Sequence, residues 1–329
     1  MKAYSKCREA ASFNQDTEVN TDDLEAIADL ILGGESSDPV PLATITESLP
    51  QNGEGSVAVT RESIVYFSLP LAENTDLTNE NFYALYSGER LDTRIELSSN
   101  RLKATLFYLE QLPADSRIRV VFKADGLTDM MDRQLDVDGD GTQGGLTAFD
   151  FDTVSITPLA GTAISGNVYA SAKNLSGENV PLQGVEIEVV GAEETLRTTT
   201  DANGAFTLDP SPSGRFFVNI DGRPVTGGFP NGAYYPFVGK AWTAIAGRTD
   251  NLVNETGEIF LPLISSGTLQ STSQSEDTTI TFPQSVLDET PALVGVQVTV
   301  PAASLFDNSG SRGGQVGIAP VPADRIPEP

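Results

Sequence analysis

The sequence contains no histidine and only one cysteine, Cys7. Without histidine the chain cannot build a Ser-His-Asp or Cys-His nucleophile arrangement, and it lacks the ligand on which nearly all catalytic zinc sites depend. A single cysteine excludes an internal disulfide bond. These absences argue against thiol and zinc chemistry, and we expect that the protein is not an enzyme.

Basic residues are scarce. The chain of 329 residues has 20 Lys and Arg against 46 Asp and Glu, which gives a formal net charge of -26. Nucleic-acid binding needs a basic stripe that neutralises phosphates, so the composition argues against this partner. The acidic excess is typical of proteins that bind divalent cations, or that are simply kept soluble by their charge.

Long hydrophobic runs are also missing. No apolar run approaches the length that would span a bilayer, so no membrane span is expected. Residues 1–20 contain no apolar core of a signal peptide. We therefore expect either a cytoplasmic chain or an internal piece of a longer exported protein.

The residues that are present predict β-structure. The 30 glycines and 20 prolines punctuate short apolar runs, several of which alternate between apolar and polar side chains. The length allows two or three domains. We predict a mostly β chain of tandem β-sandwich domains, with one short N-terminal helix and a β-rich C-terminal segment. The predicted parts are residues 1–36, 37–160, 161–264 and 265–329.

An acidic loop, Asp136–Gly145, is the clearest candidate site. Asp136, Asp138 and Asp140 alternate along it, with Thr142 two positions further on. Calcium loops supply oxygen ligands at positions 1, 3 and 5 and a backbone carbonyl at position 7, which is the spacing of these four residues. The spacing predicts a structural Ca²⁺ site. The alternative is a solvated Asp/Gly turn between two strands.

The calcium spacing is incomplete at its far end. Position 12, which carries a bidentate glutamate in such loops, is occupied by Thr147. We expect that Asp150 or Asp152, on the following strand, completes the ligand set.

A second candidate loop lies near the N-terminus. Counted from Ser12, oxygen-bearing side chains again follow calcium-loop spacing; they are Asn14, Asp16, Glu18, Asn20 and Asp23. A helix is predicted over Asp22–Leu32, with an apolar face of Leu24, Ile27, Ala28 and Ile31. The stretch resembles one half of a dockerin type I repeat, which implies that Asn14, Asp16, Asn20 and Asp23 bind Ca²⁺. The alternative is an ordinary capped helix.

Residues 37–160 resemble the bacterial Ig-like domain of the S-layer type. The resemblance rests on a set of short motifs; they are Ile64–Leu71, Leu112–Asp115, Gly126–Asp129, the acidic loop and Phe149–Thr153. It implies a β-sandwich of about seven strands.

The next part, Ala163–Asp221, resembles the carboxypeptidase regulatory-like domain, a small transthyretin-like sandwich. The motifs are Ile164–Val168, Pro181–Val189 and Thr200–Phe206. The resemblance implies a structural module without chemistry of its own. Alternation predicts a buried face and, opposite it, Glu186 and Glu188 in water; the buried residues are Val185, Ile187, Val189, Phe206 and Leu208.

An aromatic cluster follows; its members are Tyr234, Tyr235, Phe237 and Trp242. We expect it to pack in a core, and the alternative is a platform on which carbohydrate stacks. Towards the end, Val298–Leu305 resembles the start of a ZU5-like β-domain. Gly313–Arg325 resembles a stretch of large bacterial surface proteins, some of which carry RHS repeats.

Together these observations predict a non-enzymatic structural or adhesive segment of an exported bacterial surface protein, stiffened by calcium. The expected location is extracellular or at the cell surface. Expected partners are neighbouring domains of a longer chain, with carbohydrate or another surface protein as further possibilities. The alternatives are a carbohydrate-binding accessory region of a secreted enzyme, and the N-terminal part of an RHS-type toxin. Paired carboxylates serve glycosidases, but here they occupy turns and alternate strand faces, where solvation explains them.

Overall fold

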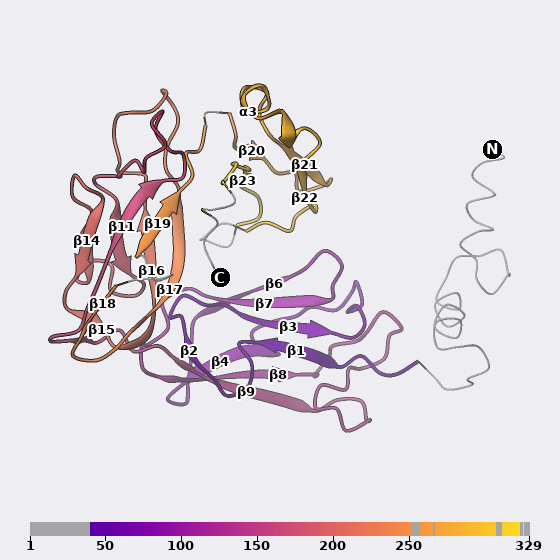
Figure 1. Ribbon diagram of the computed structural model, residues 1–329. Coiled ribbons are helices and arrows are strands. Elements are labelled where there is room, and N and C mark those ends of the chain that lie inside the picture. The colour runs from indigo at the N-terminus through magenta and orange to yellow at the C-terminus, as the bar shows by residue number, and fades with distance from the viewer. Residues whose placement is uncertain (1–39, 252–256, 266, 307–310, 323–324, 326–329) are drawn as a thin grey trace, which may run out of the picture.

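The computed structural model describes residues 40–251, 257–265, 267–306, 311–322 and 325. Over these ranges the chain is mostly β, and its strands form tandem sandwiches followed by a small β-rich segment (Figure 1). The predicted fold class is therefore confirmed for the described residues. The predicted N-terminal helix and the loop before it lie outside them.

The first sandwich packs two sheets face to face. We call the four-stranded sheet, in the order β1-β3-β7-β6, sheet A, and the five-stranded sheet, in the order β2-β9-β8-β4-β5, sheet B. Neighbours are antiparallel except β2 and β9, which are parallel. Sheet A contains β1 (Ile45–Leu49), β3 (Ser63–Phe67), β7 (Lys103–Tyr108) and β6 (Thr93–Leu97). Sheet B contains β2 (Glu54–Val57), β9 (Leu146–Thr153), β8 (Arg117–Lys123), β4 (Phe82–Tyr86) and β5 (Glu89–Arg90).

Strand alternation builds the core of this sandwich. On β8, Ile118, Val120 and Phe122 are fully buried, while Arg117 and Arg119 face solvent. The Phe122 ring lies 5.6 Å from that of Phe67 in sheet A and 5.4 Å from that of Phe82 in sheet B. Large aromatic rings that bridge both sheets bury much apolar area, which holds the layers together.

The second sandwich has the same two-layer plan. In sheet C, β11 pairs with β14 on one edge and with β18 and β19, both parallel to it, on the other; sheet D runs β13-β12-β16-β17. Sheet C contains β11 (Ala163–Ala170), β14 (Ala205–Leu208), β18 (Thr249–Asn251) and β19 (Glu258–Leu261). Sheet D contains β13 (Arg197–Thr199), β12 (Glu186–Val189), β16 (Gly214–Asp221) and β17 (Phe237–Ala244). A short pair, β10 (Pro158–Leu159) and β15 (Ser211–Pro212), lies beside them.

The predicted buried face of the second sandwich is confirmed; its members are Val185, Ile187, Val189, Phe206 and Leu208. The prediction that Glu186 and Glu188 lie in water is only partly right, because both are half-buried. Burial, together with the charges of Glu186 and Glu193, raises the pKa of Glu188.

The C-terminal segment contains two small antiparallel pairs; they are β20 (Gln270–Ser271) with β23 (Gln315–Val316), and β21 (Thr278–Thr281) with β22 (Gln297–Val300). A short helix, α3 (Gln284–Glu289), and a 3-10 turn, η1 (Pro291–Leu293), connect β21 to β22. The sequence did not predict α3, since six residues are too few to show helical periodicity.

The parts of the molecule contact one another directly. At the junction of the sandwiches, Val190 packs into the first core, and a Cβ atom on Gly191 would lie 2.6 Å from Val59 Cγ2. The C-terminal segment lies against the β6 and β7 side of sheet A (Figure 1). There the Phe306 ring is 5.7 Å from that of Phe107.

Candidate metal site

The acidic loop is anchored in the first core. Leu135 and Val137, on either side of Asp136, are buried, and the Asp136 N–H donates to the Ala43 carbonyl at 2.9 Å. The two ends of the loop are joined because the Gly144 N–H donates to the Leu135 carbonyl at 2.7 Å. The hydrophobic residues between the acids thus fix where the loop begins and folds back.

The loop brings together the three predicted carboxylates. One oxygen from each of Asp136, Asp138 and Asp140 lies within 4.8 Å of the others, and within the described ranges no other group of three or more Asp, Glu, Cys or His side chains is so close. Asp136 is buried and the other two are exposed. Gly139 and Gly141 have φ of 75° and 86°, which are left-handed conformations that favour glycine and turn the backbone around the cluster.

Backbone N–H groups hold the buried carboxylate in place. Asp136 Oδ1 accepts from the N–H groups of Gly139 at 2.8 Å and Asp140 at 3.2 Å, and Oδ2 accepts from that of Gly141 at 2.9 Å. A carboxylate offers about four lone-pair positions, so Asp136 retains room for one further donor or a cation.

The two exposed carboxylates are held differently. Asp138 lies over Gly145, where a Cβ atom would be 2.3 Å from its Oδ2, so only glycine leaves it space. Thr142 donates its hydroxyl and its N–H to Asp140 Oδ1, which lowers the pKa of that carboxyl group. Asp140 is consequently ionised at neutral pH, and the predicted contribution of Thr142 to a metal shell is left to its backbone carbonyl.

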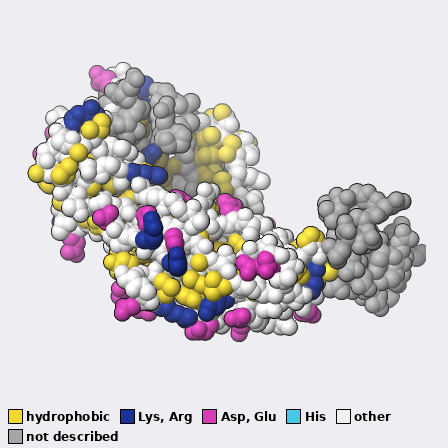
Figure 2. All heavy atoms as spheres, turned by 90° about the horizontal axis from the view of Figure 1, so that it is seen from below, with side chains coloured by type: hydrophobic (Ala, Val, Ile, Leu, Met, Phe, Trp, Pro, Cys, Tyr) yellow, Lys and Arg dark blue, Asp and Glu magenta, His cyan; other side chains and the backbone are white. Residues whose placement is uncertain are grey.

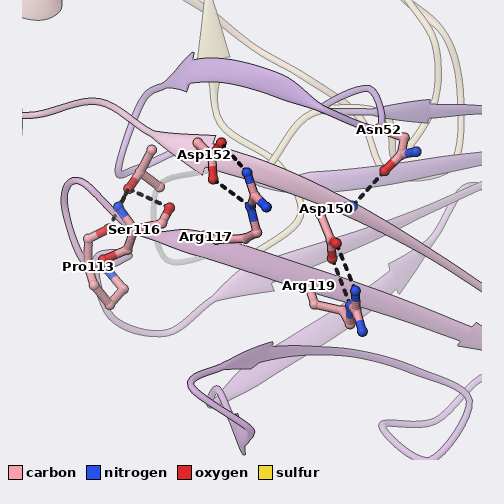
Figure 3. Close-up of polar contacts among 8 residues, drawn as sticks. Asn52, Pro113, Ser116, Arg117, Arg119, Asp150 and Asp152 are labelled. Atoms are coloured by element: carbon pink, nitrogen blue, oxygen red, sulfur yellow. Dashed lines mark hydrogen bonds and ion pairs between the residues drawn. The ribbon is translucent and has the colours of Figure 1, made fainter.

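The expectation that Asp150 or Asp152 completes the shell is wrong. Both lie opposite β8 in sheet B, where each forms a bidentate ion pair with an arginine (Figure 3). Nε and Nη2 of Arg119 each donate to Asp150 at 2.8 Å, and the same two atoms of Arg117 each donate to Asp152 at 2.9 Å. The arginines lower the pKa of both carboxyl groups. Thr147, at position 12 of the loop, lies in β9 opposite Phe122.

These pairs form a ladder on the outer face of sheet B. Figure 2, which views the molecule from below Figure 1, shows basic side chains next to acidic ones on this side. Asn52 extends the ladder by accepting the Asp150 N–H at 2.9 Å. Arg117 and Arg119 alternate with apolar residues along β8, and Asp150 and Asp152 do so along β9. The pairing of the two strands, which joins them, is visible only in the fold.

Other predicted site residues have clear outcomes. Asn14, Asp16, Asn20 and Asp23 lie outside the described residues. Tyr235 and Trp242 are buried, and Trp242 stacks on Phe206 at 5.8 Å with an interplanar angle of 9°. The prediction of core packing is thus confirmed for these two residues, and they do not form a carbohydrate platform. Phe237 is 46% exposed, beneath the Arg223 guanidinium.

Among the described residues, no helix is both long enough and apolar enough to cross a membrane.

No known protein family matches the chain, and no curated protein does. Solved structures that resemble it include the N-terminal part of the bacterial S-layer protein SbsC, with a TM-score of 0.30, 16% identity, and coverage of 76% of this chain and 53% of that one. The chain therefore spans about half the length of that structure. For PcoC, a methionine-rich copper resistance protein of Escherichia coli, the TM-score is 0.24 and the identity 14%, and the match covers 34% of this chain and 98% of PcoC. For an L,D-transpeptidase from Mycobacterium smegmatis, the TM-score is 0.24 and the identity 14%, and the match covers 53% of this chain and 59% of the transpeptidase.

These similarities are too low to assign a function.

Proposed function

We propose that the chain is a non-enzymatic structural segment of an exported bacterial surface protein, located outside the cell and stiffened by Ca²⁺. The observation that carries the proposal is that the C-terminal segment is attached to both sandwiches. A segment that joins two neighbours limits their relative motion, which suits a mechanical or presenting role better than a catalytic one.

Arg312 makes the attachment to the first sandwich. Its guanidinium donates to the Leu97 carbonyl at 2.7 Å and to the Glu96 carboxylate at 3.3 Å, and it lies 4.8 Å from the Phe306 ring centre. Hydrogen bonds from a charged donor in a partly buried place are stronger than neutral ones. This contact therefore fixes the segment on the edge strand β6.

Arg325 makes the attachment to the second sandwich. It is only 4% exposed, donates to the Ala170 carbonyl at 3.0 Å and to the Asn179 side chain, and lies 4.4 Å above the Phe260 ring. A buried arginine is costly unless it is hydrogen-bonded, and here the acceptors come from sheet C and a neighbouring loop. Removal of Arg312 or Arg325 should loosen the attachment of the C-terminal segment to one of the two sandwiches.

Calcium is proposed at Asp136, Asp138 and Asp140, with the Thr142 carbonyl as a fourth ligand. Carboxylate oxygens in a flexible loop are the ligands that Ca²⁺ prefers, and three like charges this close repel each other without a cation. The loop is anchored by Leu135, which is buried in the first core, so an ion bound in the loop would stiffen that sandwich.

Arg312→Ala tests the bridge. We expect faster amide exchange and faster proteolysis within residues 267–306, with little change in sheets B and D, because Arg312 contacts only β6 and the C-terminal segment itself. The matched control is Arg61→Ala, which removes an exposed arginine whose side chain has no partner among the described residues. Identical exchange in both variants would contradict the proposal.

Gly191→Ala tests the direct contact between the sandwiches. The new methyl group would contact Val59, and the backbone of the alanine would have to keep a φ of 90°. Gly177 is the matched control, because its φ is a similar 82° but no atom lies within 4 Å of the position a Cβ would take. We expect Gly191→Ala to lower the free energy of unfolding by about 1–3 kcal/mol more than Gly177→Ala does. Adding Val59→Ala should cost less in the Gly191→Ala background than in the wild type. Equal costs in denaturant unfolding would mean that the contact is not tight.

A further inference from the structure

A cleft lies between the outer face of sheet A and Pro301–Phe306 of the C-terminal segment. Its volume is about 570 Å³, which is within the usual range of ligand sites. Strands β1, β3, β7 and β6 form the floor, the turn at Ser98–Asn100 forms one wall, and the C-terminal segment forms the other. The proposed structural role does not use this cleft.

A row of three polar side chains crosses the floor. Glu47 is the cross-strand neighbour of Tyr66, and Tyr66 is the neighbour of Lys103 on the next strand. Strand spacing separates successive members by about 5 Å. Within the described residues the carboxylate, the phenol hydroxyl and the ammonium group make no hydrogen bond or ion pair with protein. The row therefore offers a ligand one hydrogen-bond acceptor (Glu47), one group that both donates and accepts (Tyr66) and one donor (Lys103).

A further hydroxyl belongs to the same floor. Thr105 lines the cleft, and in the described part of the chain its side chain makes no hydrogen bond. A hydroxyl group can donate one hydrogen bond and accept others, so Thr105 is available to a ligand in the cleft. Its cross-strand neighbour Glu96 is already paired with Arg94 and Arg312.

The charges around the cleft identify the class of ligand. Glu47 and Lys103 have opposite signs, and Glu96 is neutralised by its arginines, so the floor favours no net charge. The chain's formal charge of -26 repels anions, and a cation would have to lie beside Lys103. A neutral molecule with many hydroxyl groups and an apolar side fits the polar row, the aromatic Tyr66 and the apolar wall of Pro301 and Phe306.

We infer that this cleft binds a neutral oligosaccharide, with Tyr66, Thr105 and the flanking charged pair as its recognition residues. Sugar hydroxyl groups both donate and accept, so they can satisfy Glu47, Tyr66 and Lys103 at once, with charge-assisted bonds at either end. The ligand would touch sheet A and the C-terminal segment together. The structural segment would thereby also be an adhesive one.

The test is calorimetric titration of the full chain with hexamers of β-1,4-glucose, α-1,4-glucose and β-1,4-N-acetylglucosamine. We expect at least one to bind with a Kd of about 1 mM or tighter. Tyr66→Phe and Thr105→Val, which each remove one hydroxyl group, should each weaken that binding by roughly threefold to tenfold. Tyr86→Phe, which changes an exposed tyrosine at the end of β4 in sheet B, should leave the binding unchanged. Thermal melts check that the variants fold, and Tyr66→Phe alone suffices if Thr105→Val does not.

The inference fails if none of the neutral hexamers binds, or if both cleft variants bind like wild type. It also fails if hexagalacturonate or hexalysine binds more tightly than the neutral sugars, because the cleft would then select a charge. None of these outcomes affects the Arg312 experiment, so the structural role is tested separately.

Discussion

Excess Ca²⁺ should raise the melting temperature of the protein by roughly 5–10 °C relative to protein in chelator. A ligand at one hundred times its Kd that binds only the folded state stabilises it by about 2.7 kcal/mol, and each kcal/mol shifts the melting of a domain of 150–250 residues by about 2–4 °C. The physical source is the cluster of Asp136, Asp138 and Asp140, whose oxygens lie within 4.8 Å and repel one another when no cation is bound. Calorimetry with titrated calcium measures the shift.

Asp138→Asn is the variant that isolates the metal. Its side chain makes no hydrogen bond within the described residues, and asparagine keeps its shape over Gly145. The calcium-dependent shift should therefore largely disappear, while the melting temperature in chelator stays the same or rises because repulsion is relieved. Asp76→Asn, at an exposed aspartate outside the loop, is the control and should keep the full shift. Coincident melts of the wild type with and without calcium would refute the site.

The buried faces of strands could be predicted from sequence because side-chain direction alternates strictly along a strand. Ile187 and Val189 illustrate this, since Glu186 and Glu188 beside them left only one orientation that builds an apolar core. The cluster of three aspartates could also be predicted from the sequence, because its residues lie within one short loop and their proximity does not depend on how strands pair. Local patterns therefore predicted local structure.

Contacts between distant residues could not be predicted in this way. Asp150 was expected at the metal because it is near the loop in sequence, but strand register places it opposite Arg119. The bond between Arg312 and Glu96 joins residues that are 216 positions apart, and no periodicity in either segment indicates it. The cleft could not be predicted for the same reason, because one of its walls is the Ser98–Asn100 turn and the other is Pro301–Phe306, about two hundred residues further along the chain.

Ile187→Ala should lower the free energy of unfolding by about 2–5 kcal/mol. Ile187 is fully buried on β12, an inner strand of sheet D, between Thr198 on one side and Ile220 on the other. The loss combines buried apolar area with a cavity that close-packed neighbours fill only in part. Denaturant unfolding measures it.

The adjacent Glu188 provides the contrast, because it points to the other face of the same strand. Its pKa in the folded protein is raised above the ordinary value of 4.5, so the ionised form destabilises the fold. That penalty is absent at pH values below about 4, where the group is protonated in both states, and it develops as pH rises through the raised pKa. Glu188→Gln should thus leave stability unchanged at pH 4 and raise it slightly at pH 8, by less than about 0.5 kcal/mol. If Glu188→Gln proved the costlier change, the strand register would be shifted by one residue, since such a shift exchanges the two faces.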